Sequence, residues 1–284
     1  MPEPLQPGLE SVAAGRTIRR ILVALDPMAQ CQGALETAAR LAARSEAELV
    51  GLFVEESELL SAAALPVTSA LRGHDFAEEA LDEAAMRRGL RAWASHAETR
   101  LAAAAARWRI KASFRVARGR VPEVLSAEAR QGDLIAMGVV ARPTGTARIG
   151  AAARSLCRGL VCPVLVMRGP AGGERPVLVV FDGSTRALAM GAELAGLLDA
   201  RFEILITEEA QREPAQAWLD ERGLGAAIER LADGGTGKVL AKVLEELRGR
   251  PARLVVLDRS GHLGSQIEAE SLLLDPDKAV VVLG

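Results

Sequence analysis

Short, uninterrupted apolar segments alternate along the chain with longer segments in which apolar residues recur at helical spacing. Apolar segments of this kind are typical of strands that are buried on both faces of a parallel sheet. In the first half they cover residues 20–25, 47–54, 133–137 and 164–167. Residues 31–44 predict a helix, with Ala34, Leu35, Ala38, Leu41 and Ala42 on one side. Strands that alternate with helices predict an α/β fold with right-handed crossovers.

An insertion at residues 55–109 interrupts this alternation in the first half. Residues 55–73 predict an irregular connection with an apolar centre, and residues 75–109 predict one long helix. One side of that helix carries Ala80, Leu81, Ala84, Ala85, Leu90, Trp93, Ala97 and Leu101. Such a stripe predicts that the helix docks on the first sheet. The leucines of the irregular connection could form a lid or a partner surface, or they could fill a gap beside the first domain. The two explanations fit equally well.

After the insertion, residues 111–116 predict a third strand and residues 121–130 a helix. Gly and Pro mark a linker at residues 169–173, after which the whole pattern restarts. The segments 20–26, 47–56, 121–125, 133–138 and 164–167 are echoed by 175–182, 201–209, 236–240, 253–258 and 280–283. Two tandem copies of one fold are therefore predicted. The expected boundaries are a disordered leader at 1–17, a first domain at 18–168, a linker at 169–174 and a shorter second domain at 175–284.

Composition narrows the function classes. The net charge is -2 and aromatic residues make up 3% of the chain, with no Tyr, which argues against nucleic-acid binding. No apolar segment reaches the length of a membrane span, so membrane insertion is not expected. The three cysteines, Cys31, Cys157 and Cys162, form no CxxC pair, which favours a reduced, cytoplasmic protein.

Residues 133–168 contain the strongest candidate for a ligand site. An apolar strand stops at Gly138, a polar loop rich in Gly, Pro and Thr follows, and a helix is predicted at residues 151–160. In an open α/β sheet, ligands bind beyond the carboxyl ends of the strands. The start of a helix at that place offers N–H groups to an anion such as phosphate.

An ordered set of motifs resembles the universal stress protein family. The set comprises Asp182-Gly-Ser184 after an apolar strand, Gly119 before Val121-Pro-Glu-Val-Leu125, residues 133–138 and Cys162-Pro-Val-Leu-Val166. The resemblance implies two open, parallel, five-stranded sheets in the order 3-2-1-4-5, Rossmann-like, with helices on both faces. It also implies that the halves pack as a pseudo-dimer through their fifth strands. The family comprises stress-response proteins, some of which bind ATP.

By this resemblance, one adenine-nucleotide site is expected in the first half. Ala24, Leu25, Asp26 and Val54 would meet the adenosine. Met137, Gly138, Ala141, Gly150, Ala151 and Ala152 would line the ribose and phosphates, with Mg²⁺ accompanying the nucleotide and no other metal. Asp26 could bind the ribose or cap the following turn, and these alternatives are about equal.

The loop departs from the family pattern in three ways. Ala141 replaces a glycine, Ala151 replaces a hydroxyl residue, and the spacer before Gly150 is one residue short. The two substitutions are expected to weaken ATP binding about tenfold to a hundredfold. In the second half, Asp258 stands where the first loop glycine belongs, and only two residues separate Gly261 from Gly264. That loop is expected to be a structural turn.

No catalytic set is visible, since His74, His96 and His262 are isolated in sequence, so an enzyme is not expected. The leading hypothesis is a stress-response binding or signalling module with an unknown protein partner. The alternatives are an ATP-binding protein with slow hydrolysis and an interaction scaffold with both pockets closed. The charged residues at 78–91 are interpreted as a solvated helix face. A homodimer is a further expectation.

Overall fold

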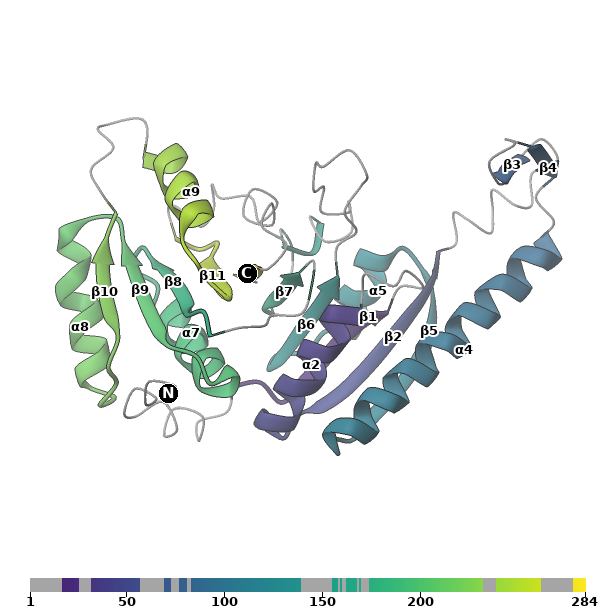
Figure 1. Cartoon of the computed structure of the whole chain (residues 1–284), viewed down its shortest axis with the longest axis horizontal. Helices are drawn as coiled ribbons and strands as arrows, with labels where there is room; N and C mark the ends of the chain where they lie inside the picture. Colours follow the sequence, from purple (N-terminus) through teal and green to yellow (C-terminus); the bar gives the residue numbers. More distant parts are fainter. Residues whose placement is uncertain are drawn as a thin grey trace.

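The computed structural model describes residues 17–25, 32–56, 69–72, 77–80, 83–138, 155–157, 159, 162–167, 169, 174–231, 239–261 and 278–284. Within these residues a single ten-stranded sheet runs through both halves of the chain (Figure 1). The first half contributes β1 (Arg20–Leu25), β2 (Glu48–Glu56), β5 (Ala112–Gly119), β6 (Asp133–Gly138) and β7 (Val164–Met167). The second contributes β8 (Val177–Phe181), β9 (Phe202–Ile206), β10 (Ala227–Arg230), β11 (Leu254–Asp258) and β12 (Ala279–Leu283).

The strand order confirms the predicted fold class. The sheet runs β10-β9-β8-β11-β12-β7-β6-β1-β2-β5, which is the order 3-2-1-4-5 in the second half followed by its reverse in the first. In this sheet, all strand pairs within a half are parallel. The fifth strands, β7 and β12, pair antiparallel, with Leu165 opposite Val281. The two copies therefore form the predicted pseudo-dimer within one chain, and a homodimer would need another surface.

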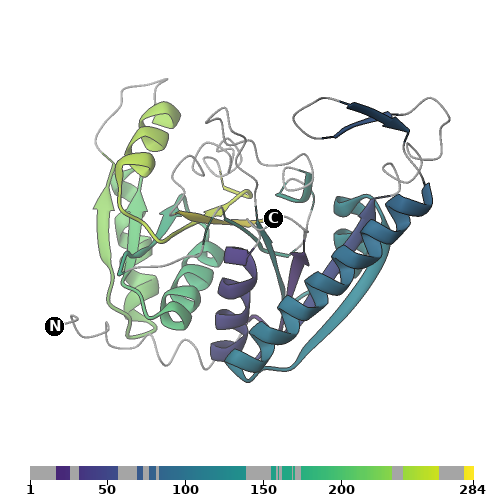
Figure 2. The same ribbon diagram turned by 45° about the vertical axis from the view of Figure 1, so that its right-hand side comes forward.

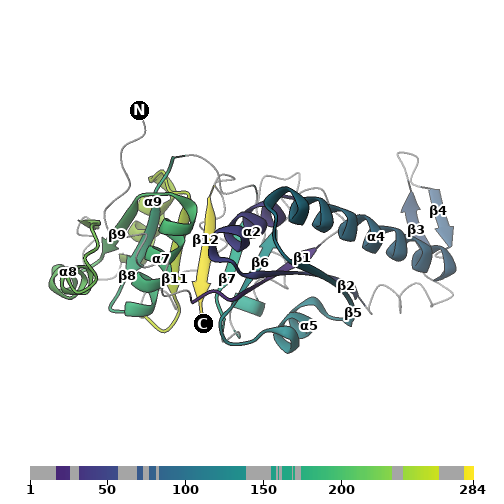
Figure 3. The same cartoon turned by 90° about the horizontal axis from the view of Figure 1, so that it is seen from below.

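Helices cover both faces of the sheet. One core cluster includes buried residues of α2 (Gln32–Ser45), α4 (Glu83–Trp108), α7 (Thr185–Leu198) and α8 (Arg212–Asp220). The other includes residues of α5 (Val121–Glu128) and α9 (Val239–Gly249). Figure 3 shows α5 on the opposite side of the sheet from α2 and α4. A short 3-10 turn, η3 (Glu209–Gln211), precedes α8. Among the described helices, none is long and apolar enough to cross a membrane.

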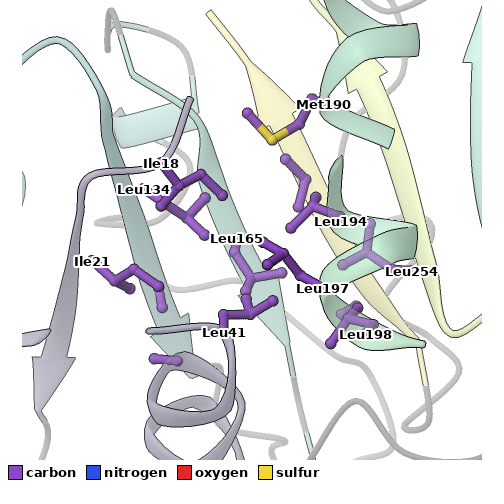
Figure 4. Close-up of a cluster of buried hydrophobic side chains, with 14 of the residues drawn as sticks. Ile18, Ile21, Leu41, Leu134, Leu165, Met190, Leu194, Leu197, Leu198 and Leu254 are labelled. Atoms are coloured by element: carbon purple, nitrogen blue, oxygen red, sulfur yellow. The ribbon is translucent and has the colours of Figure 1, made fainter. Parts of the chain in front are cut away.

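Apolar side chains from both halves meet in one buried cluster where the copies join (Figure 4). The first half supplies Ile18, Ile21, Leu41, Leu134 and Leu165, and the second supplies Met190, Leu194, Leu197, Leu198 and Leu254. Polar contacts reinforce this join. The Glu193 carboxylate accepts hydrogen bonds from the backbone N–H groups of Thr17 (3.0 Å) and Ile18 (3.2 Å). Arg40 donates to the Leu198 carbonyl at 2.7 Å.

The insertion differs from its prediction in three respects. Residues 69–72, expected to be irregular, form a strand. The helix begins at Glu83, because residues 77–80, expected to be helical, form β4 (Ala77–Ala80) and bond to β3 (Ser69–Arg72) instead. The predicted stripe is also partly wrong, since Trp93 is 45% exposed and Ala84 is exposed. The buried positions of α4 are Leu90, Ala94, Ala97, Leu101 and Ala104. These recur every three or four residues, and this narrower stripe docks α4 on β2 and β5.

A buried ion pair ties β1 to β6 at the amino ends of these strands. The Arg20 guanidinium donates to both carboxylate oxygens of Asp133, at 3.0 and 2.5 Å, and to the Glu128 carbonyl at 2.7 Å. Both side chains are almost fully buried. The hydrogen bonds that Arg20 donates to Asp133 raise the pKa of Arg20 above its usual value, so the guanidinium stays charged.

Replacement of Arg20 should therefore be costly. We expect Arg20→Met to lower the free energy of unfolding by about 3–5 kcal/mol, because it leaves the Asp133 carboxylate buried and unpaired. Arg115→Met is the matched control, since it removes an exposed pair with Glu128 and should cost at most about 1 kcal/mol. Urea denaturation at neutral pH measures both. Equal, small losses in the two variants would contradict a stabilising role for the buried pair.

Candidate functional site

Five of the predicted site residues lie at the carboxyl edge of three adjacent strands. Ala24 and Leu25 end β1, Val54 lies near the end of β2, and Met137 and Gly138 end β6. Ala24 pairs in register with Met137 on one side and with Leu52 on the other. The chain leaves β1 toward β2 and later returns to β6 on the opposite side. This reversal is the switch point at which open α/β sheets bind ligands.

The side chains at this edge do not all face the same way. Ala24 and Val54 are half-buried and, with the buried Met137, belong to the core cluster on the α5 face. Leu25 is packed into the opposite cluster, under α2 and α4. Its side chain therefore lies away from Ala24, and only its backbone reaches the same edge. The remaining three side chains form an apolar floor beside Gly138.

The other predicted residues, Asp26, Ala141, Gly150, Ala151 and Ala152, lie outside the described residues. Of the four residues expected at the adenosine end, the structure therefore places Ala24, Leu25 and Val54 at one edge of the sheet. The binding roles expected for all ten residues, including Met137 and Gly138, stay predictions from the sequence.

Strand register locates the equivalent position in the second half. Gly138 is opposite Met167 in the β6–β7 pair, and Asp258 is opposite Leu283 in the β11–β12 pair. Met167 and Leu283 each end the fifth strand of their own half. Asp258 therefore occupies the place that Gly138 has in the first half, as the sequence comparison predicted.

The second half fills this place with its own side chains. Asp258 is 1% exposed, and its carboxylate accepts hydrogen bonds from the Ser184 hydroxyl (2.5 Å) and from the hydroxyl (2.5 Å) and N–H (2.9 Å) of Ser260. Arg186 lies 3.9 Å away. Next to it, Gly261 approaches the Asp182 carboxylate so closely that a Cβ on Gly261 would lie 2.0 Å from an oxygen. The edge equivalent to the candidate site is therefore occupied by protein.

Electrostatics keep Asp258 negatively charged. Burial by itself would raise the pKa of this carboxyl, but the hydrogen bonds from Ser184 and Ser260, with Arg186 nearby, hold its pKa below the ordinary value. A polyphosphate at this edge would meet a fixed negative charge. Sequence reasoning missed Ser184 and Ser260 as partners of Asp258. Ser260 has the short spacing of a local turn contact, whereas Ser184 is 74 positions away and only the fold brings it close.

Comparison with known proteins agrees with this architecture. Residues 17–168 match the model of the universal stress protein family. A universal stress protein from Archaeoglobus fulgidus DSM 4304 has a similar structure, with a TM-score of 0.64 and 17% identity over 94% of this chain and 97% of that one. A protein of unknown function from Pseudomonas aeruginosa PAO1 has a TM-score of 0.59 and 22% identity over 96% and 94%. No curated protein matches the chain.

The buried Asp258 makes acid stability sensitive to its replacement. A carboxyl whose folded pKa is lowered stabilises the fold above its unfolded pKa, near 3.8, and this contribution is lost as the pH falls through the folded value. We expect Asp258→Asn to be less stable at neutral pH and to lose less stability between pH 7 and pH ~3. Urea midpoints at the two pH values measure this. The exposed Asp220→Asn is the control variant and should cost little stability at neutral pH. An unchanged acid response in Asp258→Asn would refute the assignment.

Proposed function

Because the chain belongs to the universal stress protein family, we propose that it is a stress-response binding module rather than an enzyme. It carries at most one adenine-nucleotide site, and that site lies in the first half. The observation that supports this proposal most directly is the difference between Gly138 and Asp258 at equivalent ends of β6 and β11. A glycine lets a ligand approach the backbone, whereas a buried carboxylate excludes phosphate.

The first-half edge fits the adenosine end of such a ligand. Ala24 and Val54 are half-buried and apolar, and Met137 is buried in the core cluster against which they pack. A flat, mostly apolar ring would remove the remaining surface of these side chains from water. Mg²⁺ would enter only with the nucleotide.

The phosphate end limits the affinity. Ala141 and Ala151 replace a glycine and a hydroxyl residue of the family pattern, and each loss weakens contacts to phosphate. We therefore propose weak binding of ATP or another adenine nucleotide. Slow hydrolysis would need a base or a metal ligand near the terminal phosphate, and no residue pattern in the chain supplies one.

An interaction scaffold is a second candidate function for the second half. Asp258, Ser184 and Ser260 satisfy one another there, and Gly261 covers Asp182. A site closed by its own side chains leaves that half to bind a protein partner or to support the first half. Mass spectrometry of natively purified protein distinguishes the candidates: a co-purified adenine nucleotide supports a binding site, and bare protein supports the scaffold.

The proposed location is the cytoplasm.

The nucleotide site is tested by exchanging the residues that differ between the halves. Titration calorimetry with Mg-ATP should give a Kd weaker than the low micromolar range for the unmodified chain. Gly138→Asp should abolish the heat of binding, because it places a carboxylate where phosphate would approach. Asp258→Gly is the matched control in the second half and should leave the heat unchanged.

A second pair of variants tests the adenosine end. Asp26→Ala should remove whatever binding exists, while Asp182→Ala, its equivalent in the second half, should not affect it. A low micromolar Kd, or binding lost in the second-half variants, would contradict the proposal. Melting curves should accompany each titration, so that loss of fold is not mistaken for loss of binding.

A further inference from the structure

A small cavity lies between α4 and the ends of β2 and β5, on the face of the sheet away from the candidate nucleotide edge. Its volume is about 240 Å³, and it is lined by Glu55, Arg87, Leu90, Arg91 and Arg118. Val54 and Ala117, one residue earlier on each strand, belong to the core cluster of the opposite face. Because side chains alternate along a strand, Glu55 and Arg118 point toward α4. Figure 2 shows α4 running along this face of the first half.

The cavity collects positive charge from two elements that are distant in sequence. Arg87 and Arg91 come from the first turns of α4, and Arg118 comes from β5. Among the described residues that line the cavity, three carry a guanidinium group and one carries a carboxylate. The sequence predicted a solvated helix face for the charged residues at 78–91, and Arg87 and Arg91 are indeed exposed. They also border this cavity together with Arg118 of the sheet.

Two of the guanidiniums are held in place from one side. Glu55 is buried and accepts a hydrogen bond from Arg118 Nε at 2.7 Å. Arg91 Nε donates to the Arg87 carbonyl at 3.2 Å. Arg91 and Arg118 each donate this hydrogen bond through Nε. In each guanidinium group the opposite edge, formed by Nη1 and Nη2, therefore faces away from the acceptor. Such edges bind the oxygens of phosphate or carboxylate in pairs, and less entropy is lost when the group is already held.

The size of the cavity restricts the ligand. It is smaller than the roughly 300–1,000 Å³ of pockets that take drug-sized molecules, so it suits a single oxyanion group. Of the lining residues that the structure describes, Leu90 alone has an apolar side chain. The ligand is therefore held by charge and hydrogen bonds rather than by apolar area.

We propose that this cavity is a phosphate-binding site, for inorganic phosphate or the phosphate group of a small monoester, separate from the nucleotide edge. Arg91 and Arg118 are the main ligands, and Arg87 adds a third positive charge. Glu55 is a positioning residue that orients Arg118. Arg87 and Arg91 come from the insertion, which the second half lacks, so the site would give the two halves different ligands.

Titration of the full chain with inorganic phosphate, followed by calorimetry, tests the proposal. Saturable binding at millimolar concentration or below is expected, and the double variant Arg91→Gln, Arg118→Gln should weaken it about tenfold or more. A parallel titration with glycerol 3-phosphate shows whether the site prefers inorganic phosphate or a phosphate monoester. Clearly tighter binding of glycerol 3-phosphate would assign the site to an organic monoester. Equal affinity would assign it to phosphate itself.

The matched control is the double variant Arg107→Gln, Arg115→Gln. It removes one arginine from α4 and one from β5, each in an exposed pair elsewhere, with Glu36 and Glu128. It should bind phosphate as the unmodified chain does, as should Gly138→Asp, which alters only the nucleotide edge. An equal loss in the control variant, loss in Gly138→Asp, or no saturable binding in the unmodified chain would overturn the proposal.

Discussion

The antiparallel pairing of β7 with β12 is the interaction on which the rest of the molecule depends. Both strands are apolar and fully buried, and each would be an exposed sheet edge if its half stood alone. Their pairing turns two five-stranded sheets into one continuous sheet and brings α2 against α7. The apolar cluster around Leu41, Leu165 and Leu194 can close only because this pairing sets the distance between the halves. The edges that remain are β5 and β10, the third strands of the two copies.

Within this symmetric frame the two carboxyl edges have different chemistry. At the end of β6, a glycine borders an apolar floor. At the end of β11, a buried carboxylate is saturated by hydroxyl and N–H donors from its own half. A buried, fully hydrogen-bonded carboxylate stabilises its loop, but it cannot coexist with a bound phosphate.

The insertion adds a second asymmetry, on the opposite face of the first half. α4 is held on β2 and β5 by small and aliphatic residues on one narrow stripe, and its arginines lie outside this stripe. Two of these arginines, Arg87 and Arg91, line a cavity together with Arg118 of β5. The carboxylate of Glu55 on β2 accepts a hydrogen bond from Arg118 and orients its guanidinium group. The short helix α8 takes the corresponding place between β9 and β10 in the second half.

The sequence by itself determined the strands of the large sheet and their order. Strands buried on both faces of a parallel sheet appear in the sequence as contiguous apolar segments, and these segments repeat. β1 and β7 have the predicted bounds, and the equivalence of Asp258 with Gly138 also follows from the repeat alone. Only the tertiary structure decided which side chains meet. Leu25 was expected at the ligand edge, but strand alternation places its side chain in the opposite core. Residues 77–80 fit a helical pattern, yet they pair with β3. Ser184 reaches Asp258 and Arg118 reaches Glu55 across 74 and 63 positions, and sequence periodicity carries no information about contacts at such separations.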